Sequence, residues 1–211
     1  MFRHRTEAGQ LLAAALERFR RHRPLVLGLP RGGVVVGAEI ACALGGDLDV
    51  LLVKKLRAPD NPELAIGALC EEGRPWINQE LARATGSDPS YLQKEIAERT
   101  REMVEQSRRY RAVKPRVPPD DRVVILVDDG LATGATMMAA AQAISTFQPQ
   151  RIVVAVPVGP PDTVAALRAL PAVNEVECLH TPLWFGGVGR FYNDFTQVED
   201  EEVVDILRQF V

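Results

Sequence analysis

Two adjacent carboxylates stand just before a step of threonine and glycine in the stretch VVILVDDGLATGAT, residues 123–136. Asp128 and Asp129 end a run of β-forming residues, and the segment Thr133–Thr136 leads into a predicted helix. Backbone N–H groups at a helix start lack intrahelical partners and lie at the positive end of the helix dipole, so they bind anions. The stretch therefore predicts a phosphate-monoester site beside two negatively charged side chains.

The acidic pair would repel a bound phosphate unless something intervenes. A sugar diol fits, because carboxylates accept hydrogen bonds from hydroxyls and could also stabilise a carbocation at the anomeric carbon. The alternatives are a divalent metal ion near the pair, or a structural role in which Asp128 and Asp129 only cap a turn. The lysine of a Walker loop is missing, and no G-x-G-x-x-G dinucleotide motif occurs.

The elements that position these residues alternate along the chain. Apolar runs predict strands at 25–29, 48–53, 123–127, 152–156 and 175–179. Periodic patterns predict helices at 6–22 (with Thr6 as N-cap), 33–44, 88–111, 134–147, 161–170 and 201–210. This order predicts an α/β fold, a five-stranded and mostly parallel sheet with helices on both faces. Ligands bind beyond the carboxyl ends of such strands, so we expect the loops Pro30–Gly33, Leu56 onward and Asp128–Thr136 to meet at one edge.

Bulk composition bounds the class of protein. The 211 residues fit a single domain, and a net charge of -3 does not support a nucleic-acid partner. Three cysteines without a C-x-x-C pair suggest a reducing compartment, and three scattered histidines argue against a histidine metal site. The start MFRHRTEAGQ lacks the apolar core of a signal peptide, and no apolar run is long enough for a membrane span. We expect a cytoplasmic protein without a membrane partner.

The stretch VVILVDDGLATGATM resembles the phosphoribosyl-pyrophosphate (PRPP) loop of the type I phosphoribosyltransferases, closest to adenine and orotate members in its DD-x-x-A-T-G-x-T form. The resemblance covers about residues 25–195, and the long helix 88–111 departs from it. It implies one Rossmann-like phosphoribosyltransferase domain over 1–211, with a core at about 23–180 and a flexible loop at about 55–78, which contains a hairpin turn near residues 72–73. A small hood at about 181–211 completes it, and the N-terminal helix could join this hood.

The resemblance also implies roles for individual residues. Asp128 and Asp129 would be catalytic and bind the ribose hydroxyls, while the 5′-phosphate would be held by Ala132, Thr133, Gly134, Ala135 and Thr136. Pyrophosphate would be bound by an early loop that often holds a cis peptide, placed here at Pro30–Arg31, and by basic residues at the root of the flexible loop: Arg31, Gly32, Gly33, Lys54 and Lys55. Arg31 could instead lie at a solvent-facing turn, and the two lysines could belong to an ordinary hairpin. Trp184 and Phe185 would stack on the base, or form a small local core.

The implied reaction transfers the 5-phosphoribosyl group of PRPP to a nitrogen of a nucleobase or similar small molecule and releases pyrophosphate. Mg²⁺ would bind through PRPP near Asp128 and Asp129 without direct protein ligands. Ala132 stands where 6-oxopurine enzymes carry an acid, which argues against hypoxanthine or guanine and leaves the acceptor open. We expect a homodimer or larger homo-oligomer. The alternatives are a non-catalytic sensor of PRPP or nucleotides with the same fold, and a phosphatase or kinase, for which no nucleophile or nucleotide site is evident.

Overall fold

The large sheet confirms the predicted five strands. The computed structural model describes residues 1–71 and 75–211, without the side chains of residues 62 and 63. The strands are β1 (Leu25–Gly28), β2 (Asp47–Val50), β6 (Val123–Val127), β7 (Arg151–Val158) and β8 (Glu175–His180). They lie in the order β2-β1-β6-β7-β8, and every neighbouring pair is parallel.

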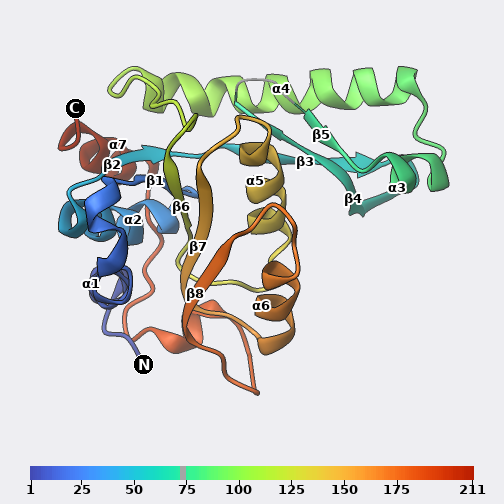
Figure 1. The fold of residues 1–211 in the computed structure, drawn as a ribbon. Coiled ribbons are helices and arrows are strands. Elements are labelled where there is room, and N and C mark those ends of the chain that lie inside the picture. The colour runs from blue at the N-terminus through green and yellow to red at the C-terminus, as the bar shows by residue number, and fades with distance from the viewer. Residues whose placement is uncertain (72–74) are drawn as a thin grey trace.

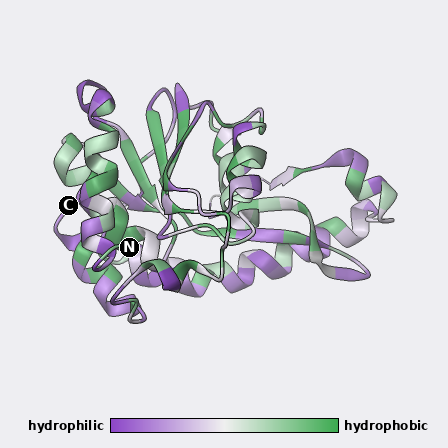
Figure 2. Cartoon of the chain, turned by 90° about the horizontal axis from the view of Figure 1, so that it is seen from below, coloured by the Kyte–Doolittle hydropathy of each residue, from purple (hydrophilic) through white to green (hydrophobic). Residues whose placement is uncertain are grey.

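Helices cover both faces of this sheet (Figure 1). α1 (Arg5–Ala15) and α2 (Gly32–Leu44) lie on one face, and α5 (Ala135–Ser145) and α6 (Pro161–Arg168) lie on the other. Successive residues of a strand point to opposite faces, so β6 supplies Ile125 to the first core and Leu126 to the second. Figure 2 shows green, apolar strands in the large sheet and many purple, polar residues along the long helix at the side of the molecule.

The segment predicted as a flexible loop at 55–78 largely forms a second, antiparallel sheet. Its strands are β3 (Val53–Ala58), β4 (Asn61–Cys70) and β5 (Pro75–Ile77). The strand predicted at 48–53 ends at Val50, and Val53 is the first residue of β3. β4 and β5 pair on either side of the predicted hairpin turn at Glu72–Gly73, which lies outside the described residues.

The long helix predicted at 88–111 is α4 (Pro89–Arg111), with Asp88 as its N-cap. It follows the short α3 (Gln79–Ala84) and runs along one side of the molecule beside the small sheet (Figure 1). Only a narrow stripe of α4 is apolar: Met103 is buried, and Leu92 and Ile96 are half-buried. None of the described helices combines the length and apolarity needed to cross a membrane.

The N-terminal helix differs from the prediction at both ends. His4, not Thr6, caps α1, because its Nδ1 accepts a hydrogen bond from the Glu7 backbone N–H at 3.2 Å. The helix ends at Ala15, and the 3₁₀ helix η1 (Glu17–His22) follows. Leu16, which lies between the two helices, and Phe19 of η1 are both buried in the core.

The C-terminal hood contains η2 (Val188–Phe191) and α7 (Asp200–Arg208), and the N-terminus joins it. Phe2 bridges to Tyr192, its N–H donates to the Phe191 carbonyl at 2.7 Å, and its carbonyl accepts from Asn193 at 2.8 Å. Figure 1 shows the N-terminus beside the hood, at the end of the sheet where the loop after β6 lies. The N-terminal residues and the hood segment around Tyr192 thus meet next to the predicted site.

Candidate active site

The loop after β6 lines a cavity of about 200 Å³. Its walls come from this loop, the start of α5 and one hood residue: Asp128, Gly130, Leu131, Ala132, Thr133, Gly134, Ala135, Thr136, Met137 and Val188. All five residues predicted to hold a 5′-phosphate are therefore brought together around one hollow, with one of the two aspartates.

The first N–H groups of α5 lack intrahelical partners, and that of Ala135 donates to the Thr133 hydroxyl oxygen at 3.4 Å. Gly134 is the N-cap with a φ of 69°, a left-handed conformation that favours glycine. The Met138 N–H donates to the Gly134 carbonyl at 2.9 Å, so the N–H groups before it precede the first intrahelical bonds. Thr163 of α6 fixes the loop from behind, since its hydroxyl donates to the Ala132 carbonyl at 3.1 Å.

The Pro30–Gly33 loop lies directly against the acidic pair, as predicted from the shared sheet edge. A Cβ on Gly33 would come within 2.5 Å of the Val127 carbonyl oxygen, and one on Gly32 would overlap the Asp129 carboxylate. Only glycine allows this approach. The peptide bond between Pro30 and Arg31 is cis, as the resemblance implied.

The two aspartates occupy different environments. Asp128 faces the cavity, and its Oδ1 accepts the Asp129 backbone N–H at 2.9 Å. Asp129 instead pairs with Arg5 of α1, with 2.8 Å between Arg5 Nε and Asp129 Oδ2. Both side chains of this ion pair are largely buried, with 11% and 16% exposed.

Burial dominates the electrostatics of the pair. Desolvation raises the pKa of Asp128 from 3.8 to about 8, and the charge of Asp129 adds to the rise. Desolvation also raises the pKa of Asp129, but the hydrogen bond and charge of Arg5 act in the opposite direction. The two carboxyls therefore retain protons more readily than ordinary aspartates. Only Asp129 is paired with a cation, the guanidinium of Arg5, that compensates its charge.

The other predicted cations do not line the cavity. Arg31 pairs with Glu199 of the hood at 3.0 Å. Lys54 and Lys55 lie half-buried on β3, where they pair in register with Leu69 and Ala68 of β4. Neither lysine lines the cavity, and both belong to the small sheet. Their role in binding pyrophosphate stays a prediction.

The predicted base-stacking aromatics also lie apart from the cavity lining. Trp184 is 93% exposed on the loop after β8. Phe185 stacks on Phe191, with 5.5 Å between ring centroids and an interplanar angle of 17°. Phe185 is thus part of a small aromatic cluster, and Trp184 is the ring left open to solvent.

Comparison with known proteins decides the family. The sequence profile described as a phosphoribosyl transferase domain matches residues 4–193, most of the chain. The chain belongs to the phosphoribosyl transferase family. Its α/β architecture, with a five-stranded parallel sheet and a C-terminal hood, is the type I phosphoribosyltransferase fold.

Proteins similar to this chain include two that are about twice its length and one of nearly the same length. Two Mycobacterium tuberculosis proteins, each named "Putative phosphoribosyl transferase", are 42% identical over 207 residues, which is 98% of this chain and 46% of theirs. The chain therefore spans about half the length of these curated relatives. The crystal structure of TT1426 from Thermus thermophilus is 46% identical, covers 100% of this chain and 99% of its own, and superposes with a TM-score of 0.94.

Several contacts around this candidate site were not predicted from the sequence. Arg5 holds Asp129, Val188 closes the cavity, Tyr192 donates its hydroxyl to the Asp129 carbonyl at 2.7 Å, and Glu199 pairs with Arg31. Each comes from an end of the chain and reaches the site only through tertiary packing. No motif surrounds them, so the sequence alone offered no signal beyond the expected closeness of a hood.

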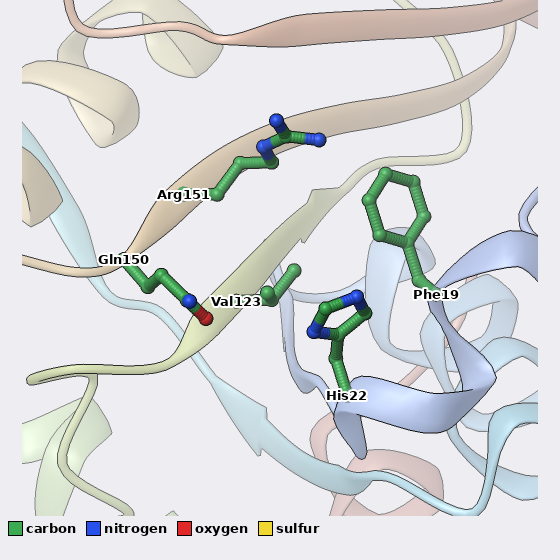
Figure 3. Close-up of a pocket in the computed structure, with 5 residues that line it drawn as sticks. All are labelled: Phe19, His22, Val123, Gln150 and Arg151. Atoms are coloured by element: carbon green, nitrogen blue, oxygen red, sulfur yellow. The ribbon is translucent and has the colours of Figure 1, made fainter.

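A second hollow, of about 400 Å³, lies at the opposite end of the sheet (Figure 3). Phe19 and His22 of η1 face Val123, Gln150 and Arg151 at the amino ends of β6 and β7. Ligands of parallel sheets bind at the carboxyl ends of the strands, and this hollow has no glycine loop and no carboxylate among its described lining residues. The smaller cavity beside Asp128 is therefore the candidate active site of this phosphoribosyl transferase.

Proposed function

We propose that the protein transfers the 5-phosphoribosyl group of PRPP to a nitrogen of a nucleobase or similar small molecule and releases pyrophosphate. The observation that carries the proposal is the layout of the 200 Å³ cavity. The half-buried carboxyl of Asp128 lines it at the end of β6, and the first residues of α5, whose N–H groups lack intrahelical partners, line its other side. A ribose 5-phosphate matches this layout, since it is neutral at its diol and anionic at its phosphate.

The phosphate end would bind to the segment 133–136. Helix N-termini bind phosphate through unpaired N–H groups and the helix dipole. Thr133 and Thr136 are exposed at this helix start and would add hydroxyl donors. The Pro30–Gly33 loop contacts the acidic pair directly, which supports its assignment to the pyrophosphate end of PRPP.

The ribose end would bind at Asp128. Positive charge develops on the ribose as the bond to pyrophosphate breaks, and a nearby carboxylate in a low-dielectric site stabilises this charge. The raised pKa of Asp128 means that its ionised form is costly without a cation. A developing oxocarbenium ion would supply that cation, so the carboxylate would interact more strongly with the transition state than with the empty site.

Magnesium would enter as part of the substrate, bound to PRPP. Among residues 1–71 and 75–211, no group of three or more His, Cys, Asp and Glu is placed to hold a metal ion. Mg²⁺ usually keeps several waters and binds through one or two carboxylates and substrate phosphates, so the single carboxyl facing the cavity fits a substrate-borne ion. Such an ion would neutralise the charge that develops on the leaving pyrophosphate.

The acceptor would approach from the exposed side of the cavity. Ala132 places no acid beside it, which favours an acceptor other than a 6-oxopurine. Trp184 is free to stack on a flat ring, and Lys54 and Lys55 would approach the pyrophosphate if the small sheet moved toward the site. Closure of such an element would exclude water and protect PRPP from hydrolysis.

The decisive experiment measures pyrophosphate release with PRPP, Mg²⁺ and a panel of nucleobases and other nitrogen acceptors. Release that depends on one acceptor identifies it. The double variant Asp128→Asn, Asp129→Asn should lose most turnover, whereas Asp162→Asn, an exposed aspartate in the first turn of α6, should retain it.

Two results would redirect the proposal. Tight PRPP binding without turnover on any acceptor would favour the sensor of PRPP. If PRPP produced no thermal stabilisation of the wild-type protein, the assignment of the cavity to PRPP would be wrong.

A further inference from the structure

Arg5 connects three parts of the molecule that are far apart in sequence. Its Nε donates to Asp129 Oδ2 at 2.8 Å, and its Nη1 donates to the Thr196 carbonyl at 2.8 Å. Its guanidinium also lies over the Phe195 ring, 4.0 Å from the centroid. The side chain is only 11% exposed, so a buried arginine is fixed between the acidic pair and the hood.

The backbone around Arg5 is equally well fixed. Phe2 forms a bridge with Tyr192, and the Asp194 N–H donates to the Arg3 carbonyl at 2.9 Å. Tyr192 in turn donates its hydroxyl to the Asp129 carbonyl at 2.7 Å. Asp129 is thus held at its side chain by the N-terminal segment and at its backbone by the hood.

This anchoring turns the Asp129 carboxylate away from the cavity. It lies against Gly32, where a Cβ would overlap Oδ2 and lie 2.9 Å from Arg5 Nε. Asp129 is not among the residues that line the cavity, whereas Asp128 is. The ion pair therefore fills the space beneath the Pro30–Gly33 loop, and the two aspartates have separate tasks.

The charges that face Asp129 come from few groups. Arg5 contributes the opposite charge, Asp128 the like charge, and Tyr192 a neutral hydroxyl whose pKa is raised by burial and then by Asp129. Arg31 in the facing loop is engaged with Glu199 instead. Arg5 is therefore the cation that compensates the acidic pair in this part of the structure.

We propose that Arg5 is a positioning residue for phosphoribosyl transfer. By pairing with Asp129 it neutralises one of the two adjacent carboxylates, fixes the acidic pair under the pyrophosphate loop, and leaves Asp128 alone to meet the ribose. The proposal rests on the proposed function, because it assigns the cavity to PRPP. It adds that the N-terminal segment and the hood act on the donor site through one ion pair.

The first test replaces Arg5 by methionine, which keeps much of the length of the side chain but removes its charge. PRPP affinity, measured by titration calorimetry, should fall about tenfold or more, since an unpaired buried carboxylate would then lie beside an anionic ligand. The pH at which the acidic pair titrates in the profile of PRPP binding should also move upward by about one pH unit, because an opposite charge at this distance lowers a carboxyl pKa by that order. Arg3→Met is the matched control, since Arg3 is an exposed arginine of the same segment and pairs with Glu7.

A double-mutant cycle tests whether Arg5 acts through Asp129. In an Asp129→Asn background, Arg5→Met should weaken PRPP binding less than about threefold, because the charge that Arg5 compensates is gone. Equal losses in both backgrounds would overturn the proposal. Arg5→Lys retains the charge and should recover part of the affinity, and it also serves as the readout if Arg5→Met does not fold.

A measurement on the free protein separates this proposal from the proposed function. Carboxyl carbon NMR titration should show that Arg5→Met raises the apparent pKa of the Asp128–Asp129 pair, while Arg3→Met leaves it unchanged. If the wild type did not bind PRPP but this rise occurred, the assignment to PRPP would fail and the pairing role would stand. If the apparent pKa did not change, the proposed role of Arg5 would be refuted whatever the ligand.

Discussion

Replacing Asp128 by asparagine should change how the free energy of unfolding depends on pH. Burial raises the pKa of Asp128 from 3.8 to about 8 in the folded protein. Between these values the folded protein holds a proton that the unfolded chain has released. The stability that this proton contributes is therefore fully present below the ordinary carboxyl pKa and is lost as pH rises toward the folded pKa. Asparagine cannot ionise, so the variant lacks this loss.

The magnitude follows from the number of protons. One proton taken up on folding gives a slope of about 1.4 kcal/mol per pH unit. Over two pH units within the window, the wild type should lose up to about 3 kcal/mol relative to Asp128→Asn. The two carboxyls titrate as a coupled pair, and Asp128→Asn also removes the like charge beside Asp129. The difference in slope between the two proteins therefore reports on the pair as a whole.

The assay is urea unfolding of both proteins near pH 5, 6 and 7, with the free energy extrapolated to water at each pH. Asp162→Asn serves as the control, since Asp162 is exposed and this change should leave the slope of the wild type intact. Parallel lines for the wild type and Asp128→Asn would refute the reasoning, because they would mean that the buried carboxyl ionises as freely as one in water. We expect Asp128→Asn to gain stability near neutrality and lose turnover, the usual exchange at a functional site.

Three further changes have separate outcomes. Gly134→Ala should lower the free energy of unfolding by at least about 1–2 kcal/mol in denaturant titration, since its φ is 69° and its Cβ would lie 2.5 Å from Thr163 Cγ2. The same variant should bind PRPP at least about tenfold more weakly, because the start of α5 would shift. Trp184→Ala should change stability by less than about 0.5 kcal/mol, because the ring is 93% exposed, yet raise the KM of the acceptor about fivefold if it stacks on a base; an unchanged KM would remove Trp184 from the site. Glu199→Gln should free Arg31 and tighten PRPP binding by about two- to fivefold at low salt, an effect that added salt should reduce in calorimetry.

The features that the sequence predicted well are those decided by neighbours in the chain. The strand predicted at 123–127 is β6 with the same bounds, and Asp88 does begin the long helix that its charge pattern indicated. The loops at Pro30–Gly33 and Asp128–Thr136 meet because parallel strands end at one edge, a consequence of topology alone. Local patterning and one rule of topology were enough to place the core of the candidate site.

The features that the sequence missed depend on contacts between distant segments. The predicted helix 6–22 ends at Ala15 and continues as the 3₁₀ helix η1, a change that the apolar pattern does not show, since Leu16 and Phe19 would share one face in either kind of helix. The segment predicted as a loop at 55–78 is mostly strand because β3 finds β4 as a partner. The pairing of Arg5 with Asp129 joins residues 124 positions apart.

That pairing changes how two adjacent carboxylates can coexist with an anionic ligand. A neutral ribose between the aspartates and the phosphate would separate the charges at Asp128, but Asp129 lies against the Pro30–Gly33 loop and is not among the residues that line the cavity. Its charge is compensated instead by an arginine that is itself bound to the hood. Arg5 itself belongs to α1, and the hood fixes its side chain through the Thr196 carbonyl and the Phe195 ring. The ion pair therefore links the N-terminal helix and the hood to the acidic pair, and the Arg5 cycle measures how much PRPP binding depends on this ion pair.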